Sequence, residues 1–256
     1  MIRFASLGSG SKGNALLVQS GRTRLLVDCG FGPRELVRRL ARLGVVPEQL
    51  DAVLVTHEHS DHIAGLAALV RRVACPVHVT RGTCAALGAR APAAESVRTI
   101  RAGETFTIGD LSVAPYAVPH DAREPVQYVL STSRLRLGVL TDAGHVTAAM
   151  QAMLAGCDAL VLEFNHDLEL LEAGPYPRFL KTRIGGPQGH LDNEAAATLL
   201  ERTDSARLQH VCAAHLSEQN NCRERVASRL ARALSPTRAT SGIASQRDGT
   251  PWCEIV

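Results

Sequence analysis

The run from His57 to His62 reads His-Glu-His-Ser-Asp-His, and it constrains this chain more than any other segment. It places four potential metal ligands within six residues, directly after the valine- and leucine-rich segment 52–55. Three crowded imidazoles repel each other when charged and lose hydration when buried, and a bound metal ion removes both problems. Imidazole suits zinc, iron and manganese, and the added carboxylate shifts the preference toward harder ions. The run therefore predicts a metal site at the end of a buried strand.

The composition predicts a globular chain with reduced thiols. It has 256 residues, 45% of them hydrophobic, and a net charge of +3, which permits a polyanionic substrate. The seven cysteines form no C-x-x-C pair and their number is odd, which favours a cytoplasmic protein over a disulfide framework. The N-terminus lacks the apolar region of a signal peptide, and no segment approaches the roughly 18 apolar residues of a membrane span. We expect one domain over residues 1–256 with no membrane contact; the sequence predicts no oligomeric state.

Short strands and amphipathic helices alternate along the chain without a clear break. A strand is expected at the C-terminus and at 2–7, 15–19, 24–28, 52–55, 77–79, 97–100, 105–108, 111–117, 126–131, 134–140, 158–163 and 208–214. Helices are expected at 33–43, 62–72, 146–155, 193–202 and 221–234. Two halves, each with sheet inside and helix outside, predict an α/β fold that is a four-layer αββα sandwich. The glycine- and proline-rich stretch 172–191 is expected to be a functional loop.

Three further candidate ligands each follow an apolar strand. His120 comes after the strand at 111–117, Asp142 after that at 134–140, and His215 after that at 208–214. Any one of them alone would be an ordinary turn residue. Strand ends that converge on one sheet edge would gather all three beside the His57–His62 run, which makes a shared metal site the better interpretation.

Together these residues resemble the metallo-β-lactamase superfamily, over essentially the whole chain. Three longer stretches are similar to its YycJ/WalJ-type nuclease branch: Gly8–Asn14, Glu163–Asp167 with Gly174–Pro177, and His215–Ser217 with Asn220 and Asn221. The resemblance implies a phosphodiesterase that acts as a 5′-to-3′ exonuclease on DNA ends, in repair or replication. It also implies two divalent ions with a hydroxide between them, Mn²⁺ being favoured and Zn²⁺ possible.

The same resemblance implies a role for each ligand. One ion would be held by His57, His59 and His120, and the other by Asp61, His62 and His215. Asp142 would bridge the two ions. Glu58 and Ser60 would face away, and Asp28 would orient the ligands from behind. Asp61 is also counted as catalytic, and His166 or His190 is expected to protonate the leaving group or grip the scissile phosphate.

Substrate contacts are expected from two other parts of the chain. The glycine-rich turn could cradle a 5′ phosphate with its backbone amides and with Ser9, Ser11, Lys12 and Asn14. Asn165 and Lys181, in the family-like and irregular stretches, are the other candidates.

The sequence departs from the branch at two positions and leaves other functions open. Gln127 stands where the branch usually has glycine, and Asp192 stands where it often has serine. Aspartate still caps a helix N-terminus, but it adds negative charge near the presumed phosphate path. The alternatives are an RNA-processing nuclease or a small-molecule or cyclic nucleotide phosphodiesterase of the same fold, or a metal-stabilised scaffold without turnover.

Overall fold

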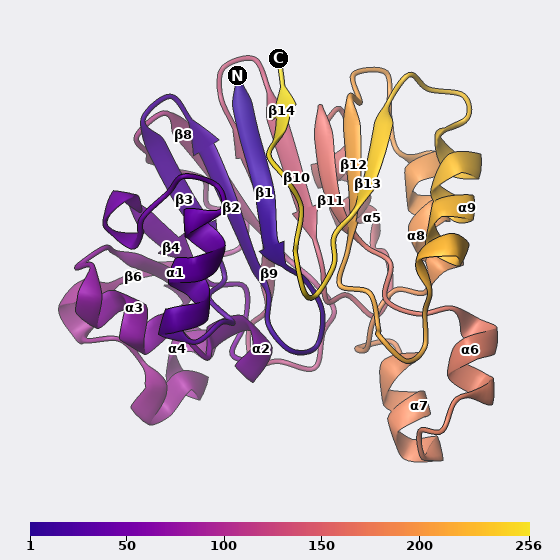
Figure 1. Cartoon of the computed structure of the whole chain (residues 1–256), viewed down its shortest axis with the longest axis horizontal. Coiled ribbons are helices and arrows are strands. Elements are labelled where there is room, and N and C mark those ends of the chain that lie inside the picture. Colours follow the sequence, from indigo (N-terminus) through magenta and orange to yellow (C-terminus); the bar gives the residue numbers. More distant parts are fainter.

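Strands with apolar side chains on both faces build the central layers of this molecule. In β2 (Ala15–Ser20), Leu16 and Val18 point into a core between two sheets, whereas Leu17 points into a second core under helices. The alternation follows from the two-residue period of a strand. Both faces must therefore be covered, one by a sheet and one by helices. The computed structural model, which describes residues 1–256, shows this four-layer arrangement (Figure 1).

The first sheet has the strand order β14-β1-β2-β3-β4-β5-β6. Its other strands are β1 (Ile2–Gly8), β3 (Thr23–Val27), β4 (Ala52–Leu54), β5 (Val77–Thr80), β6 (Val97–Ile100) and β14 (Cys253–Ile255). From β3 to β6 the neighbours are parallel. The three residues of β4 are all fully buried, as expected for a parallel strand covered on both faces.

The second sheet has the order β13-β12-β11-β10-β9-β8-β7. Its strands are β7 (Phe106–Ile108), β8 (Leu111–Ala117), β9 (Val126–Ser131), β10 (Arg136–Leu140), β11 (Ala159–Glu163), β12 (His210–Ala214) and β13 (Thr240–Ile243). The strands from β10 to β13 are parallel neighbours. Helices on the outside complete the predicted four-layer αββα sandwich, which the structure confirms.

Six helices cover the outer faces of the sheets. Against the first sheet lie α1 (Pro33–Ala41), α3 (Leu66–Arg72) and α4 (Arg81–Leu87); against the second lie α5 (Ala148–Leu154), α8 (Asn193–Arg202) and α9 (Arg223–Leu234). In α1, Leu36 and Leu40 pack into the same core as Leu17. None of the helices has both the length and the hydropathy needed to span a membrane.

The structure corrects the predicted elements in three places. The helix expected at 62–72 is divided into α2 (Ser60–Ile63) and α3 around Gly65, where the chain lies so close to Phe31 that a Cβ would overlap its carbonyl. The stretch 172–191 is not a loop throughout: it begins with the last two residues of α6 (Leu168–Ala173) and holds α7 (Arg178–Ile184). The strand β13 and the helix α4 were not predicted from the sequence.

Candidate metal centre

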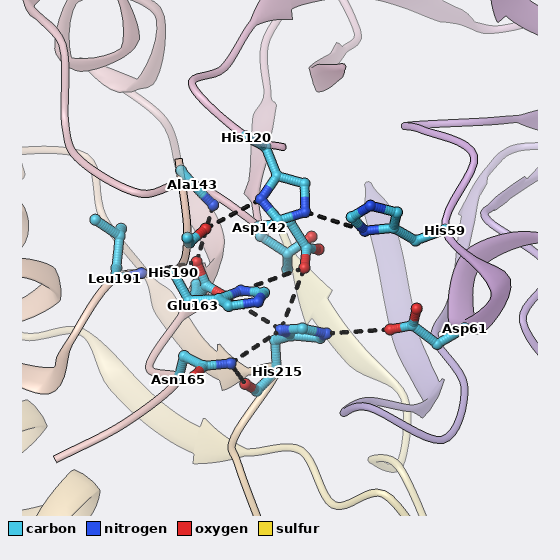
Figure 2. A network of polar contacts seen from close by, with 12 residues as sticks. His59, Asp61, His120, Asp142, Ala143, Glu163, Asn165, His190, Leu191 and His215 are labelled. Carbon is cyan, nitrogen blue, oxygen red and sulfur yellow. Dashed lines mark hydrogen bonds and ion pairs between the residues drawn. The ribbon is translucent and has the colours of Figure 1, made fainter. Parts of the chain in front are cut away.

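The candidate ligands meet where parallel strands end. The His57–His62 run follows β4, whereas His120, Asp142 and His215 follow β8, β10 and β12. The strands β10 and β12 run the same way as β11, and β8 does too because β9 is antiparallel to both β8 and β10. Figure 2 shows His59, Asp61, His120, Asp142 and His215 gathered at this edge of the sandwich.

The predicted ligands form two adjoining clusters. Donor atoms within 4.8 Å of one another define each cluster: His57, His59 and His120, and then Asp61, His62 and His215. Asp142 lies between the clusters, since it forms a further group of this kind with His57 and His62. Its Oδ2 atom is 3.3 Å from His62 Nε2. This arrangement could hold two ions with Asp142 between them.

Unsatisfied polar atoms in the clusters fit such ions. His57 Nε2, Asp142 Oδ2 and His215 Nε2 are buried and make no hydrogen bond. A buried polar atom without a partner destabilises a fold by about 1–3 kcal/mol. Imidazole nitrogens and carboxylate oxygens are donors that Mn²⁺ and Zn²⁺ accept. Divalent ions at this position would therefore satisfy all three atoms.

The electrostatics of the clusters also favour cations. Burial opposes charge on two histidines, but Asp142 and other carboxylates outweigh it: the pKa of His62 rises well above its usual value and that of His215 rises to about 10. Burial and neighbouring imidazoles lower the pKa of His57. Burial raises the pKa of Asp61 and Asp142 less than adjacent histidines lower it, so both pKa values fall. The carboxylates stay charged and demand positive charge nearby.

The backbone is strained at the strand ends that carry these groups. The three non-glycine residues with a left-handed φ are Asp28 (61°), Asp142 (55°) and His215 (56°). Such a conformation costs on the order of 1–3 kcal/mol per residue and persists where the surroundings over-determine it. In each case the chain turns sharply at the end of a strand, so that the side chain points over the sheet edge.

Asp28 lies directly behind the ligands. Its Oδ2 atom is 2.7 Å from His62 Nδ1 and accepts a hydrogen bond from Thr56 Oγ1 at 2.8 Å, and its Oδ1 atom accepts from the Thr56 amide at 2.8 Å. Burial raises the pKa of this carboxyl even though His62 and Thr56 lower it. The contacts fix the ring of His62 with its other nitrogen turned toward the cluster.

Glu163, at the end of β11, is a site residue that the sequence analysis missed. Its Oε1 atom lies 2.8 Å from His190 Nδ1 and 3.1 Å from His215 Nδ1. Its Oε2 atom accepts hydrogen bonds from the amides of Ala143 and Leu191 at 3.0 and 3.1 Å (Figure 2). Burial opposes its charge, but His190 and His215 lower its pKa below the usual value. Its place at a strand end, like that of Asp142, was the available signal.

The two histidines considered for proton transfer occupy different environments. His190 lines the cavity over the clusters and is oriented by Glu163. His166 is only 1% exposed, does not line that cavity, and makes no hydrogen bond with either ring nitrogen. The structure thus separates the pair: His190 can reach a substrate in the cavity, whereas His166 is enclosed.

Ser9 and Asn14, expected to contact substrate, instead support the ligands. Both are buried. Ser9 Oγ accepts a hydrogen bond from the His215 amide at 2.7 Å, and Asn14 Nδ2 donates to Asp61 Oδ2 at 3.1 Å. Neither lines the cavity, so their expected role is corrected to that of holding Asp61 and His215 in place.

Three backbone amides of the same turn are engaged within the fold. The amides of Gly10 and Lys12 donate to side chains at 2.8 and 2.7 Å, and that of Gly13 donates to a carbonyl of the turn. The ammonium of Lys12 is paired with Glu218 at 2.5 Å. Because these three amides are already used, they are not free to bind a phosphate, and the 5′-phosphate cradle stays a prediction; Ser11 is the residue of this turn that lines the cavity.

Asn165 and Lys181 also lie outside the cavity. Asn165 is buried, and its Nδ2 atom donates to the carbonyl of His215 at 3.0 Å. Lys181 donates to the carbonyl of Glu172, which ties α7 to the end of α6. Neither side chain lines the cavity, because each is committed to a contact within the fold; Arg183 of α7 lines it instead.

A cavity of about 390 Å³ opens over the clusters. It is lined by Ser11, His59, Ser60, Asp61, Asp121, Asp142, Tyr176, Leu180, Arg183, Ile184, Gly189, His190 and His215. Ser60 was expected to face away but forms part of this lining. Glu58 is turned toward Arg123, and its Oε1 atom accepts a hydrogen bond from the Arg123 amide at 2.7 Å.

The two departures from the branch pattern are accommodated without entering the cavity. Gln127 is buried, and its Nε2 atom donates to the carbonyl and hydroxyl of Thr141 at 2.8 and 2.9 Å, just before Asp142. Asp192 caps α8 by accepting hydrogen bonds from the amides of Glu194 and Ala195 at 2.8 and 2.9 Å. The negative charge of Asp192 is therefore engaged at a helix N-terminus.

Comparison with known proteins identifies the family of this chain. A family model described as the β-lactamase superfamily domain matches residues 23–211. The exodeoxyribonuclease YycJ of Bacillus anthracis is 36% identical over 228 residues, which are 87% of this chain and 85% of that one. The exodeoxyribonuclease WalJ of Streptococcus pneumoniae is 35% identical over 87% of this chain and 84% of its own.

Solved structures show the same fold. The metallo-β-lactamase fold protein YhfI from Bacillus subtilis superposes with a TM-score of 0.76 at 18% identity, over 99% of this chain and 100% of that one. The four layers, the ligand clusters at the strand ends and these relatives lead to one assignment: the chain belongs to the metallo-β-lactamase superfamily, in the branch of YycJ and WalJ.

Proposed function

We propose that this protein is a two-metal exonuclease that removes nucleotides from the 5′ ends of DNA. The observation that carries the proposal is the convergence of seven donor residues in adjoining clusters, four of which (His59, Asp61, Asp142 and His215) line one cavity, in a chain of the branch whose curated relatives are named exodeoxyribonucleases. Two divalent ions, with Mn²⁺ favoured over Zn²⁺, would supply a hydroxide nucleophile at neutral pH and offset the charge of the phosphate. The donors of the two clusters, with Asp142 between them, are the proposed ligands.

The chain supplies the remaining groups that phosphodiester hydrolysis needs. His190 lies on the cavity wall with Glu163 at 2.8 Å behind it, so its imidazole can hold a proton and give it to the leaving 3′ oxygen. Arg183, on the same wall, can contact a phosphate oxygen. Asp61 serves both as a ligand and, by orienting the attacking group, in catalysis.

We further propose that residues 1–256 act as one domain in the cytoplasm, at DNA ends in repair or replication. Two observations support a single domain: β1 pairs with β14 near the other end of the chain, and one core lies between both sheets. All seven cysteines are free, as expected in a reducing compartment.

A nuclease assay tests the proposal. Metal-stripped protein resupplied with Mn²⁺ is incubated with linear duplex DNA labelled at the 5′ or 3′ end, with and without a 5′ phosphate. Circular duplex and RNA of the same sequence are run in parallel. The expected result is early release of the 5′ label from linear DNA and survival of the circle. Asp142→Ala should lose this activity, whereas the surface variant Asp204→Ala should keep it.

Three results would contradict parts of the proposal. Release of the 3′ label first would overturn the polarity. Turnover of RNA but not DNA would replace the exonuclease with the RNA-processing alternative. Equal activity of wild-type protein and Asp142→Ala would remove the cluster from the reaction.

A further inference from the structure

One wall of the cavity is apolar and comes from a single segment. The hydrophobic residues of the lining are Tyr176, Leu180 and Ile184. Leu180 and Ile184 belong to α7, and Tyr176 stands two residues before its first residue. The spacing of four between Leu180 and Ile184 places both on one side of the helix, and Tyr176 lies in the segment that leads into it. Figure 1 shows α7 beyond the ends of the strands, at the edge of the sandwich that carries the ligand clusters.

The rest of the lining is polar or charged. It includes Asp61, Asp142 and His190, and Arg183 lies beside the apolar wall with its Nε atom 2.6 Å from Asp121 Oδ2. The Arg183 side chain is 60% exposed, so part of its guanidinium is accessible. The cavity thus has an ionic side and an apolar side within one space of about 390 Å³, a size typical of small-ligand clefts.

A single nucleotide has the same two-sided chemistry. Its phosphate requires cations and hydrogen-bond donors, and its base presents a flat apolar face that stacks on aromatic rings. Every base has such a face, so stacking gives affinity without sequence preference.

We propose that Tyr176, Leu180 and Ile184 bind the base of the terminal nucleotide, which stacks on the Tyr176 ring. This inference rests on the proposed function, because it names the part of a DNA end that the site recognises. It follows that the terminal base leaves its pair before cleavage, and that all four bases are accepted.

Paired substrates test the wall. A 5′-phosphorylated single-stranded oligonucleotide is compared with the same oligonucleotide carrying an abasic tetrahydrofuran residue at its 5′ end. For wild-type protein, kcat/KM should fall roughly five- to hundred-fold on the abasic substrate. In Tyr176→Ala, kcat/KM should fall by a similar factor on the normal substrate. On the abasic substrate, kcat/KM of this variant should stay close to the wild-type value. Tyr176→Phe keeps the ring and should retain the difference between the two substrates.

A matched control separates stacking from general damage to the helix. Phe179, 75% exposed, is in α7 but does not line the cavity, so Phe179→Ala should retain the full difference between the two substrates. The proposal would be overturned if Tyr176→Ala lowered kcat/KM equally on both substrates, or if wild-type protein cleaved both substrates with the same kcat/KM. Either result would mean that the apolar wall contributes only to packing within the fold.

A binding measurement keeps this test independent of turnover. An oligonucleotide with 2-aminopurine at its 5′ end is titrated with Asp142→Asn protein, with and without Tyr176→Ala. Stacking predicts quenching of the 2-aminopurine fluorescence that Tyr176→Ala removes; equal quenching in both overturns the wall. Failure of wild-type protein to cleave any DNA would overturn the proposed function, while the fluorescence result would still decide the wall.

Discussion

At the residue scale, the site depends on a few positions where backbone and side chain are both constrained. Asp142 and His215, both proposed as ligands, have left-handed φ values, and so does Asp28 behind them. The strand-end pattern predicted Asp142 and His215 as ligands, and the family resemblance predicted Asp28 as a residue that orients the ligands. It could not reveal that Ser9 and Asn14 turn inward, because their hydrogen bonds run to residues about fifty and two hundred positions away.

Replacing Asp28 by its amide should weaken metal binding without unfolding the protein. In Asp28→Asn the charge behind His62 is lost while the shape remains, and such changes typically cost 10- to 100-fold in metal affinity or activity. Titration with Mn²⁺ measures the affinity. The control is Asp51→Asn, at an exposed aspartate before β4. Unchanged affinity in Asp28→Asn would contradict the role given to Asp28.

A single methyl group at Gly30 should disturb the site. A Cβ there would overlap the carbonyl oxygen of Asp61, so the segment carrying this ligand must move. Gly30→Ala should lower the free energy of unfolding by about 1–3 kcal/mol, the usual cost of overpacking. Gly32→Ala is the matched control, since no heavy atom lies within 4 Å of a Cβ at that position. Equal urea midpoints for the two variants would contradict this reading.

At the element scale, most strands and the longer helices were predicted, whereas the short helices α4, α6 and α7 were not. The helix α8, with its aspartate cap, matches the expected range 193–202. The seven-residue helix α7 lies among glycines and prolines, where isolated helices are marginal. It is stabilised by tertiary contacts, such as the ion pair of Arg183 with Asp121, a residue that also lines the cavity. Such contacts leave no local signal in the sequence.

The cap of α8 can be tested directly. Asp192→Ala removes the acceptor of the Glu194 and Ala195 amides and should cost about 1 kcal/mol of unfolding free energy in urea. Asp192→Ser should recover most of it, since serine is also a good cap. A loss in Asp192→Ser equal to that in Asp192→Ala would show that the charge, not the cap, matters.

The contact between β5 and β7 should make stability depend on pH. His78 stacks on Phe106 with ring centroids 4.7 Å apart, and burial lowers its pKa to about 4. The unfolded chain binds this proton near pH 6.5, so the contribution is present above that pH and is lost as the pH falls from about 6.5 to 4. As the pH falls from 7 to 5, the unfolding free energy of His78→Phe should therefore rise relative to that of the wild-type protein. A constant difference would contradict the pKa shift.

At the scale of the whole molecule, the two halves share one site. The first sheet brings the His57–His62 run and the second brings His120, Asp142 and His215, so bound ions would link the sheets. The fold and this convergence were predictable because apolar strands followed by polar ligands define both. The apolar wall of the cavity was not predictable, because Tyr176, Leu180 and Ile184 line it only through the tertiary placement of α7.

Removing metal should lower the thermal stability of the molecule. Ligands that bind only the folded state stabilise it, by about 2.7 kcal/mol at one hundred times Kd. Chelator should therefore lower Tm and excess Mn²⁺ should restore it, as measured by calorimetry. The shift should shrink in Asp142→Ala. A Tm indifferent to chelator and Mn²⁺ would mean that ions do not join the two halves.

Two ions are proposed to bind at the strand ends, and an anomalous difference map of Mn²⁺-soaked crystals would locate them. We expect two peaks, one among His57, His59 and His120 and one among Asp61, His62 and His215, with Asp142 between them. A single peak, or strong peaks only elsewhere on the molecule, would contradict it.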